Sequence, residues 1–378
     1  MKLVIISNMA HYRRADGTIV GHGATARELS VLAELFDEVR HVACLHAEPP
    51  PASALPYTAA NLELVPVPPA GGDDVLAKLD IFRKLPLYAA TIRRELRGAD
   101  AVHVRCPANI SMVALGLLET RAEPHRRWIK YAGSWEPRPD EPLSYRLQRE
   151  WLARPHRHMA VSVNGAWPEQ PPHVHTLANP CLTDDELERG RAAAARKSLR
   201  QPLRLLFVGH LGAAKNPEVA IEALADLRAR GVDAMLDVVG EGDNLDELRA
   251  KVAARELSAA IDLHGPLPRN ALDELYAAAH FVVLPSRTEG WPKVLGEGMA
   301  FGAVPIATAV GSIPSVLAAA QIGHVLELPP QAQDIVAAIR GYLDEPARWQ
   351  RESARAVDAA ASFSFSAYRE AVRGLLEL

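Results

Sequence analysis

Short apolar runs alternate with helical patterns along the first half of the chain. The run KLVIIS (residues 2–7) is followed by a glycine-containing loop, by the segment ATARELSVLAELF (24–36) and by the apolar run VRHVACL (39–45). This order predicts parallel strands that are joined by helices. Further strands are expected at residues 62–67, 101–106, 127–133 and 158–163, with helices over 85–97 and 111–119. The first half therefore predicts a doubly wound α/β sheet.

The second half starts the same alternation again. Strands are expected at residues 203–209, 234–240, 261–265, 281–286 and 304–308, and helices at 218–230, 245–256, 269–279 and 293–301. The pattern predicts a second Rossmann-like sheet. The intervening run NPCLTDDELERGRAAAARKSLRQP has the composition of a linker, which places the boundary near residues 184–202. We expect domains over 1–190 and 200–350, and a C-terminal helix within 351–378 that packs back on the first domain.

Length and composition agree with two soluble domains. A chain of 378 residues is longer than one ordinary core requires. The hydrophobic share of 48% and the charged share of 23% are typical of globular proteins. A net charge of -4, divided almost evenly between the halves, gives no basic footprint for a nucleic acid. We therefore do not expect a nucleic-acid partner.

Cysteine usage and the N-terminus indicate the compartment. Cys44, Cys106 and Cys181 lie far apart and form no CxxC pair, which argues against a disulfide framework and a structural zinc site. The N-terminal MKLVIISN is interpreted as a buried strand and not as a signal peptide. No apolar run reaches the roughly 18 to 20 residues of a membrane-spanning helix. The expected location is the cytoplasm, with the inner face of the membrane as a further option.

Glycine-rich loops follow three strands of the second half. They are VGHLGAAKNPE, VGEGDN and LPSRTEGWPK, and ligands of open α/β sheets bind at loops in this position. Pro292 suits the first position of a helix, so Lys293, Val294 and Leu295 would present their amides to an anion. Lys215 and Lys293 add two cations, and His210 is a possible third donor. A diphosphate is the expected ligand.

Two glutamates, Glu289 and Glu297, are separated by seven residues around the start of this helix. Glu289 stays in the loop, and Glu297 lies about one turn inside the helix. Ionised carboxylates are strong acceptors, so one can take paired hydroxyls of a hexose and the other those of a ribose. Gly296 and Gly298 would let the ligand approach Glu297.

These residues resemble a known family. The twin Rossmann-like halves, with GHLGAAKN and SRTEGWPKVLGEGMAFGAVPIAT, are similar to the retaining glycosyltransferases of family four, which have the GT-B fold of two domains facing a central cleft. The resemblance implies that Glu289 contacts the donor sugar, Glu297 the ribose and Lys215 the diphosphate. It also implies that residues 265–267 lie near the base, that Gly21 and Gly23 approach the donor, and that residues 1–190 bind the acceptor.

The predicted activity is transfer of a sugar, with retention, from a nucleotide diphosphate, expected to be UDP, to a glycan, a lipid-linked or a small-molecule acceptor. No metal or other cofactor is expected. The predicted catalytic residues are Glu289, Lys215 and His210. The predicted substrate-binding residues are Gly21, Gly23, Glu297, Lys293, Val294, Leu295, Gly209, Gly290, Leu267, Ser134 and Arg105.

The chain departs from the family pattern in two places. His210 stands where the family has an arginine beside the diphosphate, and Arg287 is a candidate to compensate for the missing charge. The first loop is rich in His11, Arg13 and Arg14, which hints at an anionic acceptor.

Several of these features have plainer explanations. Glu297 could be a solvated helix position, Lys215 a surface residue near a helix cap, and Trp135 a packing residue. The HxH pairs at 156/158 and 173/175 lack helical i,i+4 spacing and are interpreted as surface histidines. The basic and apolar segment KLDIFRKLPLYAATIRRELRG (78–98) is either an ordinary amphipathic helix or a peripheral membrane contact.

Other functions also stay open. A sugar-nucleotide epimerase or hydrolase would use the same residues without an acceptor, and a noncatalytic subunit would only bind the sugar nucleotide. A nicotinamide-dependent oxidoreductase is disfavoured, because neither half has a GxGxxG turn followed by a ribose-binding acid. The oligomeric state is not predicted.

Overall fold

The computed structural model describes residues 1–51, 53–70, 75–137, 141–156, 158–167 and 169–378, and the side chains of residues 75–79 are not described. The chain divides into two compact units. Unit 1 comprises Met1–Asn164, Pro168–Leu177 and Tyr368–Leu378, and unit 2 comprises Gly165–Trp167 and Ala178–Ala367. The chain thus passes from unit 1 to unit 2 and returns at its C-terminus.

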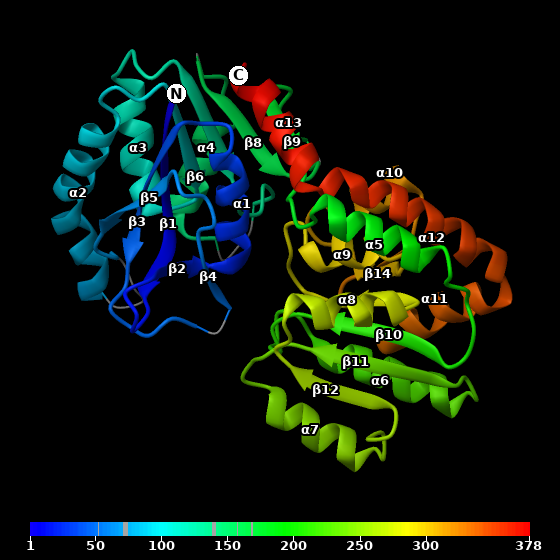
Figure 1. Ribbon diagram of the computed structural model, residues 1–378. Coiled ribbons are helices and arrows are strands. Elements are labelled where there is room, and N and C mark those ends of the chain that lie inside the picture. Colours follow the sequence, from blue (N-terminus) through cyan, green and yellow to red (C-terminus); the bar gives the residue numbers. More distant parts are fainter. Residues whose placement is uncertain (52, 71–74, 138–140, 157, 168) are drawn as a thin grey trace. The chain divides into compact units, whose positions relative to one another are not determined.

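Unit 1 is built on a nine-stranded sheet (Figure 1). Its strands are β1 (Lys2–Arg13), β2 (Ile19–His22), β3 (Glu38–Leu45), β4 (Ala54–Pro56), β5 (Leu62–Val67), β6 (Ala101–Cys106), β7 (Arg126–Tyr131), β8 (Ala160–Asn164) and β9 (Val174–Leu177). Its helices are α1 (Gly23–Ala33), α2 (Val75–Glu95), α3 (Asn109–Glu119) and α4 (Leu143–Leu152), joined by most of α13 (Phe365–Leu376). One path through the sheet runs β4-β2-β1-β6-β7-β8-β9, while β3 pairs with β1 and β5 pairs with β3. The central strands are buried on both faces, as expected for parallel strands covered by helices.

Strands β2, β4 and β9 of unit 1 were not predicted, and two further elements differ from the prediction. The loop expected after Ser7 is instead a continuation of β1, which pairs antiparallel with β2 through His11–Gly21. The buried and exposed positions alternate along this extension, which is a strand pattern. The helix expected to begin at Leu85 is α2, which begins at Val75 and contains Pro86.

Unit 2 is a parallel six-stranded sheet with the order β12-β11-β10-β13-β14-β15. The strands are β10 (Leu203–Val208), β11 (Ala234–Val239), β12 (Ile261–Gly265), β13 (Phe281–Leu284), β14 (Val304–Thr308) and β15 (His324–Leu326). The helices are α5 (Asp184–Ala194), α6 (Pro217–Ala229), α7 (Leu245–Ala254), α8 (Arg269–Ala278), α9 (Lys293–Ala300), α10 (Ile313–Ala320), α11 (Ala332–Asp344) and α12 (Pro346–Ala360). The sheet is Rossmann-like, as predicted, and five of its strands lie close to the expected positions; β15 was not predicted.

The C-terminal region holds two helices where one was expected over 351–378. Helix α12 packs against α5 and α9 within unit 2. Helix α13 brings Tyr368, Val372 and Leu376 into the hydrophobic core of unit 1, where they meet residues of β1 and α1. The α13 residues that belong to unit 1 therefore complete a core built mainly from the first 177 residues.

Four side chains of unit 1 form a chain of hydrogen bonds, in the order His11, Tyr57, His41 and Ser7. His11 Nδ1 lies 3.0 Å from the carbonyl of Met9, so this nitrogen carries the proton and Nε2 accepts from the Tyr57 hydroxyl at 2.5 Å. Tyr57 must then accept from His41 Nδ1 at 2.6 Å, which leaves His41 Nε2 to accept from Ser7 Oγ at 2.8 Å. Burial lowers the pKa of His11 to about 4. Both imidazoles are therefore held neutral, in defined tautomers.

The three cysteines are free and buried. Cys44 and Cys106 belong to unit 1, and Cys181 belongs to unit 2. Burial raises the pKa of the Cys106 thiol to about 12 and raises that of Cys181 further. In the described part of the chain, no helix combines the length and the apolar character that crossing a membrane requires.

Candidate functional site

The loops at the carboxyl edge of the unit 2 sheet are joined by backbone hydrogen bonds. The amide of Arg287, after β13, donates to the carbonyl of Ala214, after β10, at 2.8 Å. The amide of Ser312, after β14, donates to the carbonyl of Gly290 at 3.0 Å. Gly311 has a φ of +58°, and a Cβ there would lie 2.4 Å from the Glu289 carbonyl. Three loops that are distant in sequence thus form one connected rim.

Lys215 and Glu289 meet at this rim. Lys215 Nζ is paired with Glu289 Oε1, although the two residues lie on different loops. The Glu289 side chain is mostly buried, whereas 27% of the Lys215 side chain is exposed. Gly209 lies beside the lysine, because a Cβ at this position would be 3.8 Å from Lys215 Cγ. The structure therefore brings together three predicted site residues.

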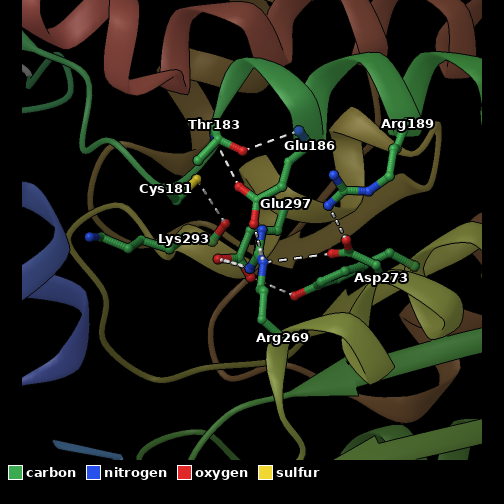
Figure 2. Close-up of polar contacts among 9 residues, drawn as sticks. Cys181, Thr183, Glu186, Arg189, Arg269, Asp273, Lys293 and Glu297 are labelled. Carbon is green, nitrogen blue, oxygen red and sulfur yellow. Dashed lines mark hydrogen bonds and ion pairs between the residues drawn. The ribbon is translucent and has the colours of Figure 1, made fainter. Parts of the chain in front are cut away.

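Helix α9 begins at Lys293, as predicted, but Pro292 is its N-cap and not its first helical residue. Pro292 has an extended ψ of 120° and is the N-cap, so Lys293, Val294 and Leu295 are the first three helical residues. The Leu295 amide donates to the Pro292 carbonyl at 3.1 Å, and its side chain is fully buried. Leu295 therefore cannot offer its amide to a diphosphate in this conformation. In Figure 2 the Lys293 side chain points away from Glu297.

Glu297 is held on both of its oxygens. Arg269 Nη1 lies 2.5 Å from Oε1, and the Tyr276 hydroxyl donates to Oε2 at 2.8 Å. Both partners come from α8, which packs against α9. Each carboxylate oxygen has two lone pairs, so the carboxylate keeps acceptor capacity for ligand hydroxyls. Glu297 is therefore an oriented carboxylate and not a solvated helix position.

Arg269 connects Glu297 to a second carboxylate, as Figure 2 shows. Its Nε donates to Glu186 Oε1 at 2.8 Å. Glu186 is also part of the capping box of α5, with the Thr183 amide 2.7 Å from its Oε2. Burial alone would lower the pKa of Arg269, but the carboxylates of Glu297 and Glu186 outweigh it and raise the pKa. Arg269 therefore stays charged between two mostly buried acids.

The glycines around these residues fall into two groups. A Cβ at Gly290 would meet nothing within 4 Å, so the space beside this residue is open. A Cβ at Gly298 would lie 2.4 Å from Val282 Cγ2, and one at Gly296 would lie 3.2 Å from Cys181 Sγ. The space predicted beside Glu297 for ligand approach is therefore filled by protein on the sides of Gly296 and Gly298.

Three further residues complete the rim. His210 is exposed in the loop after β10, and Leu267 is half-buried in the loop after β12. Trp291 is buried, stacks on Phe363 at 4.6 Å between ring centroids, and its Nε1 has no hydrogen-bond partner among the described residues. Trp291 is therefore a packing residue of this loop whose buried N–H is unsatisfied by the described residues.

The remaining predicted residues belong to unit 1. A Cβ at Gly21 would lie 2.5 Å from Met9 Cε, and one at Gly23 would lie 2.5 Å from the Ser53 carbonyl. Close packing within unit 1 is therefore sufficient to require glycine at both positions. Ser134 is half-buried, and its hydroxyl donates to the Glu136 carbonyl at 3.1 Å. Trp135 is buried edge-on against Tyr131, as its packing interpretation expects.

Arg105 lies at a buried charge cluster that borders a cavity. Its Nη1 lies 2.7 Å from Glu28 Oε1, which also accepts from Lys130 Nζ at 2.8 Å and from the Tyr368 hydroxyl at 3.2 Å. Arg105 lines a cavity of about 370 Å³ at the carboxyl ends of the unit 1 strands, together with Ser7, Cys106 and Gly133. This cavity is large enough for a small ligand.

Ligand-type side chains form one compact group in the described residues, made of Asp237, Asp262 and His264. His264 Nε2 lies 2.7 Å from Asp237 Oδ1, and Arg204 lies 3.5 Å from the same carboxylate. His264 and Arg204 thus hold Asp237 in place. The predicted HxH histidines are used elsewhere, since His156 and His173 bond to the carbonyls of Trp151 and Leu152.

Sequence reasoning missed Arg269, Tyr276 and Glu186. Arg269 is the first residue of a helix with apolar periodicity, and this pattern gave no sign that its side chain turns toward α9. A weak signal existed in the apolar character of VLGEGMAFG, because a glutamate there needs a buried partner.

Comparison with solved structures identifies the fold. Sucrose-phosphate synthase from Thermosynechococcus elongatus superposes with a TM-score of 0.69 at 18% identity, covering 100% of this chain and 98% of that one. Anabaena HepE in complex with UDP superposes with a TM-score of 0.66 at 15% identity, covering 100% of both chains. The chain therefore has the predicted GT-B fold of glycosyltransferases, with two Rossmann-like units.

Sequence comparison finds a matching family and several curated relatives. Residues 191–362 match the family "Glycosyl transferases group 1". D-inositol 3-phosphate glycosyltransferase from Corynebacterium aurimucosum is 35% identical over 182 residues, which are 46% of this chain and 43% of the relative. Alpha-D-kanosaminyltransferase from Streptomyces kanamyceticus is 28% identical over 209 residues, 53% of each chain. The chain spans about half the length of these curated relatives, and its match to the group 1 glycosyl transferases covers residues 191–362.

Proposed function

We propose that this chain is a retaining glycosyltransferase of family four that transfers a sugar from a nucleotide diphosphate sugar, with UDP as the expected nucleotide. The proposal rests above all on the contact between Lys215 and Glu289 at the carboxyl edge of the unit 2 sheet. A cation for a diphosphate and a carboxylate for sugar hydroxyls lie side by side there, next to the start of α9. The match of this region to the group 1 glycosyl transferases supports the same activity.

The proposed chemistry depends on stabilising the leaving diphosphate. Negative charge develops on the diphosphate as the bond to the sugar breaks, and preorganised cations and amides lower that barrier. Lys215, Lys293 and the first amides of α9 supply this stabilisation, with His210 as a further donor. The acceptor attacks from the face that the diphosphate leaves, and a phosphate oxygen takes its proton. No metal is required for these steps.

Glu289 and Glu297 have different roles in this proposal. Glu289 is a positioning and sugar-binding residue, since its contact with Lys215 also fixes the lysine. Glu297 accepts from the ribose hydroxyls with the lone pairs that Arg269 and Tyr276 leave free. The acceptor binds to unit 1, where Arg105 offers positive charge to an anionic group at the cavity. Inositol phosphate is the acceptor that the name of one relative suggests.

A contact with an anionic membrane surface is part of the proposal for unit 1. Helix α2 exposes 69% of Phe82 and nearly half of Leu87, next to exposed Arg83. Exposed apolar side chains beside arginines are typical of interfacial helices. The Lys78 side chain, which the same segment includes, lies outside the described residues. Sedimentation with anionic and neutral vesicles tests this contact; equal binding of the wild type and of Phe82→Ser to both vesicles would contradict it.

Calorimetric titration with UDP, GDP and ADP, without added metal, is the decisive experiment. Lys215→Ala and Glu297→Ala should each weaken binding of the preferred nucleotide at least ten-fold, because each removes a charged contact. Lys251→Ala is the matched control, since Lys251 is paired with Glu222 and is 29% exposed, but lies on α7 away from the rim. Failure of all three nucleotides to bind would contradict the proposal.

Product analysis separates the alternatives within the fold. A hydrolase or epimerase converts the sugar nucleotide without an acceptor, whereas a transferase releases the nucleotide faster when an acceptor is added. A noncatalytic subunit binds the nucleotide and converts nothing. Glu289→Ala should abolish acceptor-dependent release in the transferase; full activity in this variant would refute the assignment of Glu289.

A further inference from the structure

Unit 2 has a hollow at the edge of its sheet opposite to Lys215 and Glu289. It has a volume of about 360 Å³ and is lined by the linker after α5, the start of β10 and the end of α8. Arg204 is the second residue of β10, and His280 directly precedes β13, so both lie at the amino ends of their strands. A six-residue strand separates this hollow from the carboxyl edge by about 20 Å.

The hollow is strongly basic. Four cationic side chains line it, namely Arg196, Lys197, Arg200 and Arg204, and none of the described residues that line it is acidic. Arg204 lies 3.5 Å from Asp237. Arg196 and Arg200 are exposed and have no carboxylate within ion-pair distance among the residues that the structure describes. At least two of the four positive charges are therefore without a counter-charge.

The hollow also has a fixed framework. Lys197 Nζ donates to the carbonyls of Tyr276, Ala279 and Phe301 at 3.0, 2.7 and 2.7 Å, at the ends of α8 and α9. The three carbonyls at helix C-termini favour a cation here, whereas burial lowers the pKa of Lys197 to about 7. His280 accepts from the Arg204 amide at 3.0 Å and donates to the Ser198 carbonyl at 3.1 Å, which ties the linker to the strand.

The basic side chains of the hollow surround His280. Burial lowers the pKa of His280 to about 4, and the charges of Lys197, Arg200 and Arg204 add to this effect. Lys197, Arg200 and Arg204 line the same hollow as this imidazole. Like charges that lie close together repel one another when no ligand is bound, and a bound anion relieves this repulsion.

We propose that this hollow binds a small phosphate-bearing anion, such as a phosphate ester or a diphosphate, at a site separate from the donor site. Arginine forks match the oxygen geometry of phosphate, and Arg196 and Arg200 are the free forks at the rim of the hollow. Volumes near 360 Å³ suit ligands of this size. The site shares α8 and α9 with the donor site, since Arg269 begins α8 and Glu297 lies on α9.

Residue-resolved arginine modification tests the site in the full-length chain. The protein is treated with phenylglyoxal at low ionic strength, with and without inorganic pyrophosphate, and the modified residues are identified by mass spectrometry. We expect pyrophosphate to slow modification of Arg196 and Arg200 and to leave Arg340 unchanged, an exposed residue of α11 outside the hollow. Equal rates at Arg196 and Arg200 with and without pyrophosphate would overturn the proposal.

Calorimetry gives a second, independent test. The double variant Arg196→Gln, Arg200→Gln should bind pyrophosphate at one class of sites with an affinity at least ten-fold lower. The reason is that each charged contact contributes about ten-fold or more to the affinity. Nucleotide binding that depends on Lys215 should persist in this variant, which separates failure of this proposal from failure of the proposed transferase activity. Arg340→Gln should leave both sites unchanged. An unaltered pyrophosphate isotherm in the double variant would refute the site.

Discussion

Replacing Arg269 with methionine should destabilise unit 2, because this side chain is the cation between Glu186 and Glu297. Breaking a buried ion pair by removing one partner costs about 3 to 5 kcal/mol. The Arg269 side chain is 26% exposed, so water can partly solvate the two carboxylates that its removal leaves unpaired. We therefore expect a loss of about 2 to 3 kcal/mol in the free energy of unfolding of unit 2.

Urea unfolding at pH 7, followed by circular dichroism, measures this loss. Arg249→Met is the control, because Arg249 is paired with Asp246 on the surface and the two side chains are 56% and 94% exposed. A surface pair of this kind contributes about 0 to 1 kcal/mol. Adding Glu297→Gln to Arg269→Met should recover part of the stability, since it removes one of the uncompensated carboxylates. A cost for Arg269→Met no greater than that for Arg249→Met would refute the reasoning.

Further expectations concern a histidine and two glycines. The pKa of His11 falls from its ordinary value of 6.5 to about 4 in the folded protein, so its stabilising contribution is complete above pH 6.5 and is lost as the pH falls toward 4, a change of about 3 kcal/mol. Urea midpoints at pH 7 and pH 4.5 should therefore differ less for His11→Gln than for the wild type, and an identical acid loss would contradict this. Gly298→Ala should destabilise the protein by about 1 to 3 kcal/mol, because its methyl group would meet Val282. Gly290→Ala should change the melting temperature little, since its methyl group enters open space, yet weaken nucleotide binding; a reversed order of the two melting temperatures would refute this comparison.

The sequence predicted the second sheet well, for a physical reason. Buried parallel strands are short apolar runs, and the helices between them are long enough to show their own period. Glycines and prolines then mark the loops, so Lys215 and Glu289 could be placed on loops at the carboxyl ends of strands before their contact was known. The GT-B fold is confirmed by the solved structures that superpose on the whole chain.

The elements that the sequence did not predict depend on contacts distant along the chain. The extension of β1 is stabilised by pairing with β2 and β3, and a run that contains Asn8 and His11 gives little apolar signal on its own. The helix was expected to begin at Leu85, but α2 begins at Val75 and continues through Pro86. The contact of Arg269 with Glu186 joins residues 83 positions apart, and it exists only because α5 packs against α8.

The free, buried cysteines can report how often each unit of the protein opens. Cys106 and Cys181 are closed off from solvent in different units, and a thiolate is required for reaction with a disulfide reagent. Each thiol can react only while its surroundings are transiently open, so the labelling rate of each cysteine measures how often its unit opens. Two such rates, one from each unit, would show which unit opens more often.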